Sequence, residues 1–236
     1  MTTTLAGLPG GVAISHLSVY DWPAADGACG GTPHMHLACS EAYVVTGGRG
    51  AVQTLTASGY EVTPLQAGTV AWFTPGTIHR LVNEGDLRIT VLMQNSGLPE
   101  AGDAVLTLPS EYLTDPETYT RACTIPADAP EEEQERFARA RRDLALEGYR
   151  ALRAAEGPQA LAAFHRAAAA LVQPRIAEWR ERWRQGAEAS AAATGAQLDW
   201  LERAEAPHLA HAAVRAEQPV AQGKFGMCGR LDVYEN

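Results

Sequence analysis

The sequence has no excess of positive charge, no long apolar run and no leader-like start, and each absence excludes a partner or a location. Its 19 Lys and Arg are outnumbered by 28 Asp and Glu, which gives a formal net charge of −9. Phosphate binding needs a basic face, so we expect no nucleic-acid partner. No apolar run approaches the roughly 18 residues that cross a membrane, so we expect no membrane association. The start, MTTTLAGLPGG, lacks the features of a signal peptide, which predicts a cytoplasmic protein.

Cysteine is scarce as well, and its spacing carries no motif. The four cysteines are Cys29, Cys39, Cys123 and Cys228, with no CxxC pair among them. In a reducing cytoplasm this pattern predicts free thiols. Cys39 lies within the histidine-rich stretch discussed below, and we interpret it as a small, half-buried residue rather than a reactive thiol.

The first part of the chain has the pattern of a β structure. Between residues 11 and 93, short runs rich in Val, Thr and aromatic residues alternate with glycine-rich turns such as TGGRG and NEGD. Runs of this kind at close spacing predict an all-β sandwich or barrel. A chain of 236 residues with 46% hydrophobic and 20% charged residues can bury a sizeable core. We assign residues 1–110 to a β-barrel domain.

The rest of the chain is predicted to be mainly helical. Residues 111–130 belong to a proline-punctuated passage with little periodicity, which we assign as a connecting segment. Residues 131–205 form a helical extension, which opens on Pro130 and three glutamates, a good helix start. Its first helix carries apolar or small residues at three- and four-residue spacing: Phe137, Ala140, Leu144, Gly148 and Leu152.

Two further helices are expected in this extension, followed by a tail. Residues 158–185 form the second helix, interrupted or kinked at Pro174, and residues 187–203 form the third, with Leu198 and Leu201 as its apolar residues. The buried side of the second helix is predicted to consist of Leu161, Phe164, Ala168, Leu171, Ile176, Trp179 and Trp183. The tail, residues 206–236, ends in an alternating pattern that predicts a possible edge strand for the barrel or for a partner subunit.

A cluster of metal-ligand residue types lies within the predicted barrel. His34 and His36 are two residues apart, so on a strand both side chains point to the same face. Glu41 follows shortly after, and His79 comes just after a Pro-Gly turn. Three imidazoles and one carboxylate at adjacent strand ends can hold a divalent first-row metal and leave positions open for a substrate or dioxygen. We therefore predict one metal site formed by His34, His36, Glu41 and His79.

Two motifs around these residues resemble those of the cupin superfamily. His34-x-His36-x4-Glu41-x6-Gly48 is similar to the first cupin motif, and Gly68-x6-Pro75-Gly76-x2-His79-x3-Asn83 to the second, with one residue of slack. The resemblance covers roughly residues 11–96. It implies a mainly β fold with added helices: a metal-lined double-stranded β-helix, or jelly-roll barrel, followed by a helical extension.

Several other residues are candidates for the pocket. Tyr43 is in phase with Glu41, and its hydroxyl could donate to a metal-bound oxygen, which makes Glu41 and Tyr43 the candidate catalytic residues. The alternative interpretation of Tyr43 is an aromatic that fills the barrel. Gln53, Trp72 and Gln94 are further candidates for lining the pocket. Arg80 is out of phase with His79 and is expected to face the surface. His208 and His211 have no carboxylate in register, so we expect no second metal site.

The resemblance implies an enzyme that uses one divalent transition metal ion, Fe, Mn, Ni or Zn, with Fe favoured. A non-haem dioxygenase acting on a small oxygenated metabolite is the first hypothesis, with Glu41 able to loosen and act as a base. The motifs equally resemble those of cupin sugar isomerases and epimerases, with Trp72 where an aromatic is expected, so an isomerase, epimerase or lyase is the alternative. A non-catalytic small-molecule-binding cupin is a third hypothesis. We also expect a homodimer, since cupins commonly pair through their sheets.

Overall fold

The computed structural model describes residues 7–235 of the chain. Residues 1–6 and 236, the outer ends of the predicted segments 1–110 and 206–236, lie outside this description, as does most of the start used to predict the location. The strands are β1 (Ala13–Val19), β2 (His34–His36), β3 (Glu41–Thr56), β4 (Gly59–Gln66), β5 (Val70–Phe73), β6 (Ile78–Met93), β7 (Ala104–Leu106), β8 (Ala221–Phe225) and β9 (Gly229–Val233). The longer helices are α1 (Pro116–Cys123), α2 (Glu131–Ala154), α3 (Gln159–Val172), α4 (Ile176–Trp183) and α5 (Ala189–Glu202).

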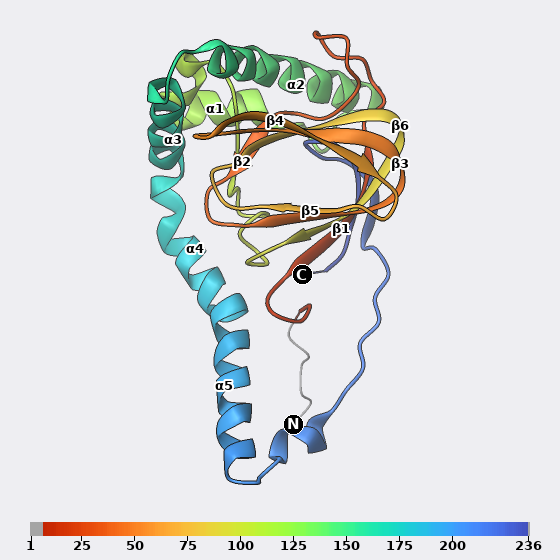
Figure 1. Ribbon diagram of the computed structural model, residues 1–236, viewed down its shortest axis with the longest axis vertical. Coiled ribbons are helices and arrows are strands. Elements are labelled where there is room, and N and C mark those ends of the chain that lie inside the picture. Colours follow the sequence, from red (N-terminus) through yellow and green to blue (C-terminus); the bar gives the residue numbers. More distant parts are fainter. Residues whose placement is uncertain (1–6, 236) are drawn as a thin grey trace.

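The strands form an antiparallel sheet that rolls around an interior (Figure 1). Its main order is β4-β3-β6-β1-β9-β8, while β2 pairs with β6 and β7, and β5 pairs with β3. The strands β3 and β6 are both 16 residues long, so each can bend and contribute to more than one side of the barrel. The architecture confirms the predicted β-barrel followed by helices.

A bulged region lets the long pair β3 and β6 bend. The register between the two strands shifts between Val45 and Gly50. Gly48 lies there with φ of +69°, and a Cβ atom at this position would clash with the carbonyl oxygen of Asp86. Only glycine combines this backbone conformation with so close an approach, so the TGGRG turn predicted from the sequence is instead a bulge inside a strand.

The helix α2 packs on the outside of the barrel through a face that only partly matches the prediction, with Gly148 buried and Leu144 and Leu152 packed against the core. Phe137 and Ala140 are exposed, whereas α2 buries Ala138, Arg142, Ala145 and Tyr149 among others. The Arg142 guanidinium donates hydrogen bonds of 2.9 Å to the carbonyl oxygens of both Trp22 and Pro23. Because Arg142 and Tyr149 belong to the packed face, a search for evenly spaced apolar residues does not identify this face.

The connecting segment is more ordered than its sequence indicates. Within residues 111–130 lies the eight-residue helix α1, whose N-terminus is capped by the Asp115 carboxylate, which accepts from the Thr118 amide at 2.7 Å. Asp115 followed by Pro116 is a helix-start signal. The helix is too short to produce an apolar period, which explains why periodicity missed it.

The later helices form a long arm that leaves the barrel (Figure 1). The helix predicted over residues 158–185 is interrupted at Pro174, as expected: a 3₁₀ turn, Gln173–Arg175, lies between α3 and α4, and a π turn, Arg184–Glu188, joins α4 to α5. The apolar residues predicted to be buried in α3 are buried, but of those in α4 only Trp179 is. In α5, Leu198 and Leu201 are 62% and 52% exposed. No described helix combines the length and apolar character that crossing a membrane requires.

The tail returns from the arm to the barrel. A short 3₁₀ turn, Pro207–His211, is followed by an extended passage and by the hairpin of β8 and β9. Strand β9 pairs antiparallel with β1, with Leu231 opposite Leu17. The last strand of the chain therefore lies beside the first strand of the same barrel.

Arg80 corrects another prediction, because it is not a surface residue. It is 1% exposed, and its guanidinium forms a two-pronged ion pair with the Asp26 carboxylate. Burial raises the pKa of Asp26, but the hydrogen bonds and charge of Arg80 outweigh burial and lower that pKa below its ordinary value. Arg80 faces away from His79, as its phase predicts, but helices and loops cover that side of the sheet.

We expect Asp26→Asn to lower the free energy of unfolding by about 2 kcal/mol at neutral pH. The buried guanidinium loses its charged partner, while solvent near the partly exposed Asp26 offsets some of the loss. Because the pKa of Asp26 is lower in the folded state, its stabilisation is complete above about pH 4 and disappears as the pH falls through the folded pKa. Urea unfolding across pH 3–7 measures both effects.

The matched control is Asp86→Asn, which breaks an exposed ion pair with Arg88. Exposed pairs contribute little, so we expect a loss below about 0.5 kcal/mol. Equal losses for the two variants would contradict a structural role for the Asp26–Arg80 pair.

Candidate metal centre

The predicted ligands are brought together by three neighbouring strands. His34 and His36 are the two ends of β2, Glu41 begins β3, and His79 lies near the start of β6. Antiparallel pairing sets His34 directly opposite His79. The alternation within β2 then places His36 on the same side as His34, so residues separated by up to 45 positions face one point.

The four side chains converge inside the barrel. Their candidate ligand atoms all lie within 4.8 Å of one another, and all four residues are buried. The Glu41 Oε2 atom lies 3.3 Å from Nε2 of His36 and 3.1 Å from Nε2 of His79. This spacing suits a single ion coordinated by every member of the cluster.

Hydrogen bonds to the Nδ1 atoms fix the orientation of the three histidine rings. Nδ1 of His34 lies 2.9 Å from the carbonyl oxygen of Thr32, and Nδ1 of His79 lies 3.1 Å from that of Thr77. Nδ1 of His36 lies 3.1 Å from a carboxylate oxygen of Asp103. Because all three partners are acceptors, each Nδ1 carries a proton, and in the neutral form of each ring Nε2 offers a lone pair. Metal-binding histidines are oriented in the same way.

Asp103 is a functional residue that the sequence analysis missed. It is fully buried, and besides His36 it accepts hydrogen bonds from the amides of Leu37 at 3.1 Å and Ala38 at 2.7 Å. Burial raises its pKa, but the hydrogen bond and charge of His36 outweigh burial and lower that pKa. The carboxylate therefore stays ionised and holds both the His36 ring and the backbone after β2. Nothing near Asp103 in sequence signals this role, because its partner is 67 positions away.

Glu41 and His34 are held in the forms that bind a metal. Burial raises the pKa of Glu41, but His79 and His36 outweigh burial and hold it well below its usual range. Burial, with the neighbouring His79 and His36, also lowers the pKa of His34 far below its ordinary value. For His36, burial lowers the pKa, yet Asp103 and Glu41 outweigh it and raise the pKa to about 9, so a metal ion would have to displace a proton from this ring at neutral pH.

The facing atoms fit a divalent cation. Oε2 of Glu41 and Nε2 of His79 are buried acceptors without a hydrogen-bond partner among the described residues. Two acceptors 3.1 Å apart repel each other unless a cation lies between them or a proton is shared nearby. Nitrogen and carboxylate oxygen donors in this ratio suit Fe, Mn, Ni or Zn.

A cavity of about 250 Å³ opens beside the cluster. Tyr43 lines it, as predicted from its phase with Glu41, and its buried hydroxyl has no hydrogen-bond partner among the described residues. Burial and the charge of Glu41 raise the pKa of Tyr43 well above its usual range, so it stays protonated as a donor. Its ring also packs edge-on against Phe73, with centroids 5.3 Å apart.

Trp72 does not line this cavity, and the prediction for it was wrong. It pairs with Ala42 on the outer face of β5 and is 73% exposed. Its neighbour Phe73, opposite Glu41, faces inward, and the centroids of the Phe73 and His79 rings are 4.3 Å apart. The aromatic near the ligands is therefore one position later than expected, which only the strand register reveals.

The two glutamines also lie elsewhere. Gln53 pairs with Arg80, and residues opposite each other share a face, so Gln53 lies on the outer side with Arg80 rather than with His79. Gln94 is exposed and its side chain accepts from the Ser40 amide at 3.2 Å. Neither glutamine is among the residues that line the cavity, which corrects their assignment to the pocket.

The tail supplies cavity residues that no motif indicated. Met227, Cys228, Leu231 and Val233 all line the cavity beside the ligands. Cys228 is buried, and burial with the charge of Glu41 raises its pKa to about 12, so it is an apolar wall residue and not a nucleophile. Cys39 is fully buried rather than half-buried, and burial and Asp103 raise its pKa as well.

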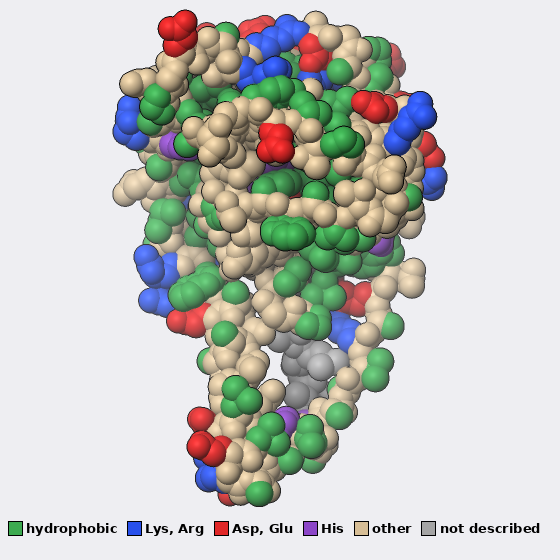
Figure 2. Space-filling model, in the orientation of Figure 1, with side chains coloured by type: hydrophobic (Ala, Val, Ile, Leu, Met, Phe, Trp, Pro, Cys, Tyr) green, Lys and Arg blue, Asp and Glu red, His purple; other side chains and the backbone are tan. Residues whose placement is uncertain are grey.

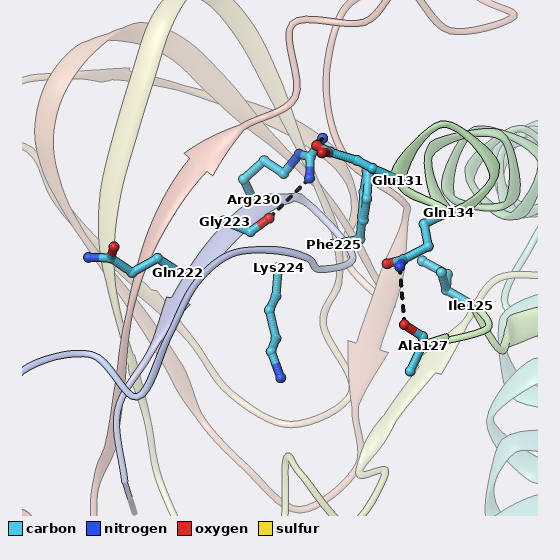
Figure 3. A pocket seen from close by; sticks show the side chains of 9 residues that line it. All are labelled: Ile125, Ala127, Glu131, Gln134, Gln222, Gly223, Lys224, Phe225 and Arg230. Carbon is cyan, nitrogen blue, oxygen red and sulfur yellow. Dashed lines mark hydrogen bonds and ion pairs between the residues drawn. The ribbon is translucent and has the colours of Figure 1, made fainter. Parts of the chain in front are cut away.

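Other candidate sites lack the same features. His208 and His211 lie on a 3₁₀ turn at the far end of the arm, and they belong to no ligand cluster found within the described residues. Figure 3 shows a larger hollow, of about 710 Å³, between the start of α2 and the β8–β9 hairpin. Its Arg230 pairs with Glu131 at 2.8 Å and lies over the Phe225 ring, and none of its lining residues belongs to the metal cluster.

The fold and the cluster together define a small barrel protein with an interior ligand set for one metal ion. Residues 24–94 match the family model described as a cupin domain. This part of the chain is therefore a cupin domain. A search of curated proteins finds no significant match.

Solved structures of similar shape include a cupin protein from Bacteroides fragilis, 26% identical over 35% of this chain and 60% of that one, with a TM-score of 0.25. An RmlC-like cupin from Desulfovibrio desulfuricans is 19% identical over 38% and 76%, with a TM-score of 0.30. A predicted oxalate decarboxylase from Thermotoga maritima is 20% identical over 35% and 64%, with a TM-score of 0.27. This chain spans about three fifths of the length of the first solved structures that it matches.

We expect Asp103→Asn to weaken metal binding by about 10- to 100-fold, since an amide cannot accept from both the His36 ring and the two backbone amides. Competition with a chromophoric chelator measures the affinity. Asp86→Asn, an exposed carboxylate on the β6 bulge, is the control and should bind metal like the wild type. An unchanged affinity in a folded Asp103→Asn protein would contradict the role given to Asp103.

Proposed function

We propose that the protein is a metal-dependent cupin enzyme acting on a small oxygenated metabolite, in the first place as a non-haem oxygenase that uses Fe. The observation that supports this proposal most is the convergence of three Nε2 atoms and the Glu41 carboxylate beside a cavity that His34, His36 and Glu41 help to line. A ligand set that fills a closed core would serve structure alone, whereas a cavity beside it leaves room for a substrate.

A bound divalent ion would supply Lewis-acid polarisation or, if redox-active, activation of dioxygen. The protein's own groups supply the rest. Asp103 and two backbone carbonyls hold the imidazole rings. The Tyr43 hydroxyl, protonated and without a partner among the described residues, is available to donate to an oxygen of the substrate. Glu41 is the only carboxylate in the ligand cluster and is our candidate for a base.

The character of the cavity favours an oxygenase over a sugar isomerase. A sugar presents a hydroxyl on nearly every carbon, and each buried hydroxyl needs a partner. Apart from the ligands, the polar side chains among the cavity-lining residues are those of Tyr43, Ser15 and Glu100. The aromatic expected in the isomerase-like motif, Trp72, is on the outer surface. An isomerase, epimerase or lyase therefore stays the second candidate.

A non-catalytic binding protein is the candidate of a different class. It would use the same cavity, but it would have no need for the Tyr43 donor beside the ligands. The cytoplasmic location and the absence of nucleic-acid and membrane partners stay predictions from the sequence.

Oxygen uptake by iron-loaded protein tests the proposal. We expect uptake with a phenol or diketone as substrate, and we expect Tyr43→Phe to lower kcat by about 10- to 1,000-fold with metal content unchanged, because it removes one donor. Ser15→Ala, which removes a cavity hydroxyl further from the ligands, is the comparison. Zinc, nickel or manganese in the purified protein, with no oxygen uptake, would favour isomerase or lyase chemistry instead.

We also propose a homodimer, formed through the arm. No residue of α5 is buried against the described part of the chain, so packing within the chain does not stabilise this helix. Figure 2 shows hydrophobic side chains along the arm and the passage that returns from it, where Leu198, Leu201, Leu209 and Val214 are exposed. A second copy of the arm supplies a matching apolar surface.

Light scattering measures the assembly. We expect a dimer for the wild type and a monomer for Leu198→Glu with Leu201→Glu. The control, Val62→Glu with Val70→Glu, changes exposed residues of the barrel and should leave the dimer intact. A wild-type monomer at micromolar concentration would refute the dimer.

A further inference from the structure

We infer that the cavity selects a substrate with one metal-binding oxygen head group, an apolar body of a few carbons and at most one negative charge. The inference rests on the proposed metal function and adds to it the chemical class of the substrate. It comes from β1, β9 and the second half of β6, which lie outside the metal-binding motifs.

The register of the sheet places ligand and wall residues in continuous rows. Glu41 of β3 is opposite Met93 of β6, which in turn is opposite Ala13 of β1. Residues opposite each other in a sheet share a face, so this whole row faces the interior. This row therefore begins at a ligand and continues through β6 onto β1, which carries no ligand.

The next row holds the polar groups and the far wall. Tyr43 is opposite Val91, Val91 is opposite Ser15, and Ser15 is opposite Val233 of β9. The third row ends with Leu17 opposite Leu231. Adjacent strands lie about 4.8 Å apart, so β1 is roughly 10 Å from β3 along the sheet. The apolar wall thus extends away from the ligands over a distance that several carbon–carbon bonds span.

The side chains of this wall are almost all apolar. Besides the ligands and Tyr43, the cavity is lined by Ala13, Ile14, Ser15, Leu17, Val91, Met93, Pro99, Glu100, Met227, Cys228, Leu231 and Val233. A body with several hydroxyl groups would leave them without partners against this wall. At about 250 Å³ the cavity is smaller than those that hold drug-sized ligands, which favours a molecule of about a dozen non-hydrogen atoms or fewer.

Charge limits the head group. No lysine or arginine is among the residues that line the cavity, and Glu100 adds a carboxylate whose Oε2 accepts from the Gly97 amide at 2.9 Å. A divalent ion would be offset by the Glu41 carboxylate and by the ionised Asp103 carboxylate behind His36, so the ligand set holds no surplus positive charge for more than one anionic head group. A second carboxylate or a phosphate would be buried without a counter-charge.

Three 2-hydroxy acids with the same head group test this inference on zinc-loaded full-length protein by isothermal titration calorimetry. 2-Hydroxyhexanoate has three more methylene groups than lactate, and each buried methylene raises affinity roughly fourfold, so we expect about 50-fold tighter binding. 2-Hydroxyglutarate has a second carboxylate, and we expect it to bind no tighter than lactate. Equal affinities, tighter binding of 2-hydroxyglutarate, or no binding of any acid to metal-loaded protein would overturn the inference.

Two variants locate the selection on the wall. Val233→Asp puts a charge on β9, and Val91→Thr puts a hydroxyl on β6 without a change of volume. Both should reduce the advantage of 2-hydroxyhexanoate with metal content unchanged. Val70→Asp, on the outer face of β5, is the control and should keep it. Metal content is measured first: a protein that binds no metal contradicts the proposed function, whereas a metal-loaded protein without chain-length preference contradicts only this inference.

Discussion

The whole site depends on one constraint: acceptor atoms face each other in a part of the barrel that water hardly reaches. Nε2 of His79 and Oε2 of Glu41 lie 3.1 Å apart, both buried, and the protons of the rings are on the opposite nitrogens. Such an arrangement is unfavourable unless a cation balances it. Asp103 and the carbonyls of Thr32 and Thr77 maintain it by holding each ring from behind.

Strand register then turns this cluster into a pocket. The same cross-strand pairs that bring Glu41 to the interior bring Met93 and Ala13 to it, and the last strand, β9, adds Leu231 and Val233. The chain therefore travels through the whole helical arm before it completes the cavity wall that begins at β1. The helices are linked to the site through this returning tail rather than through a ligand of their own.

The parts that could be predicted from the sequence are those encoded locally. The two-residue spacing of His34 and His36 is enough to place both on one face, and the alternation of Glu41 and Tyr43 does the same for β3. Asp103, Phe73 and the tail could not be predicted, because their positions follow from pairing between distant strands. The burial of Arg80 and Arg142 could not be predicted for a related reason: each is a charged residue buried against partners that only the tertiary structure supplies.

The metal content of protein purified without chelator tests the central claim most directly. We expect about one transition-metal ion per chain in the wild type, since four ligands converge on one point. We expect almost none in a folded His34→Ala, His79→Ala double variant. A double variant that keeps the full metal content would contradict the site itself, and with it the function and substrate class that rest on it.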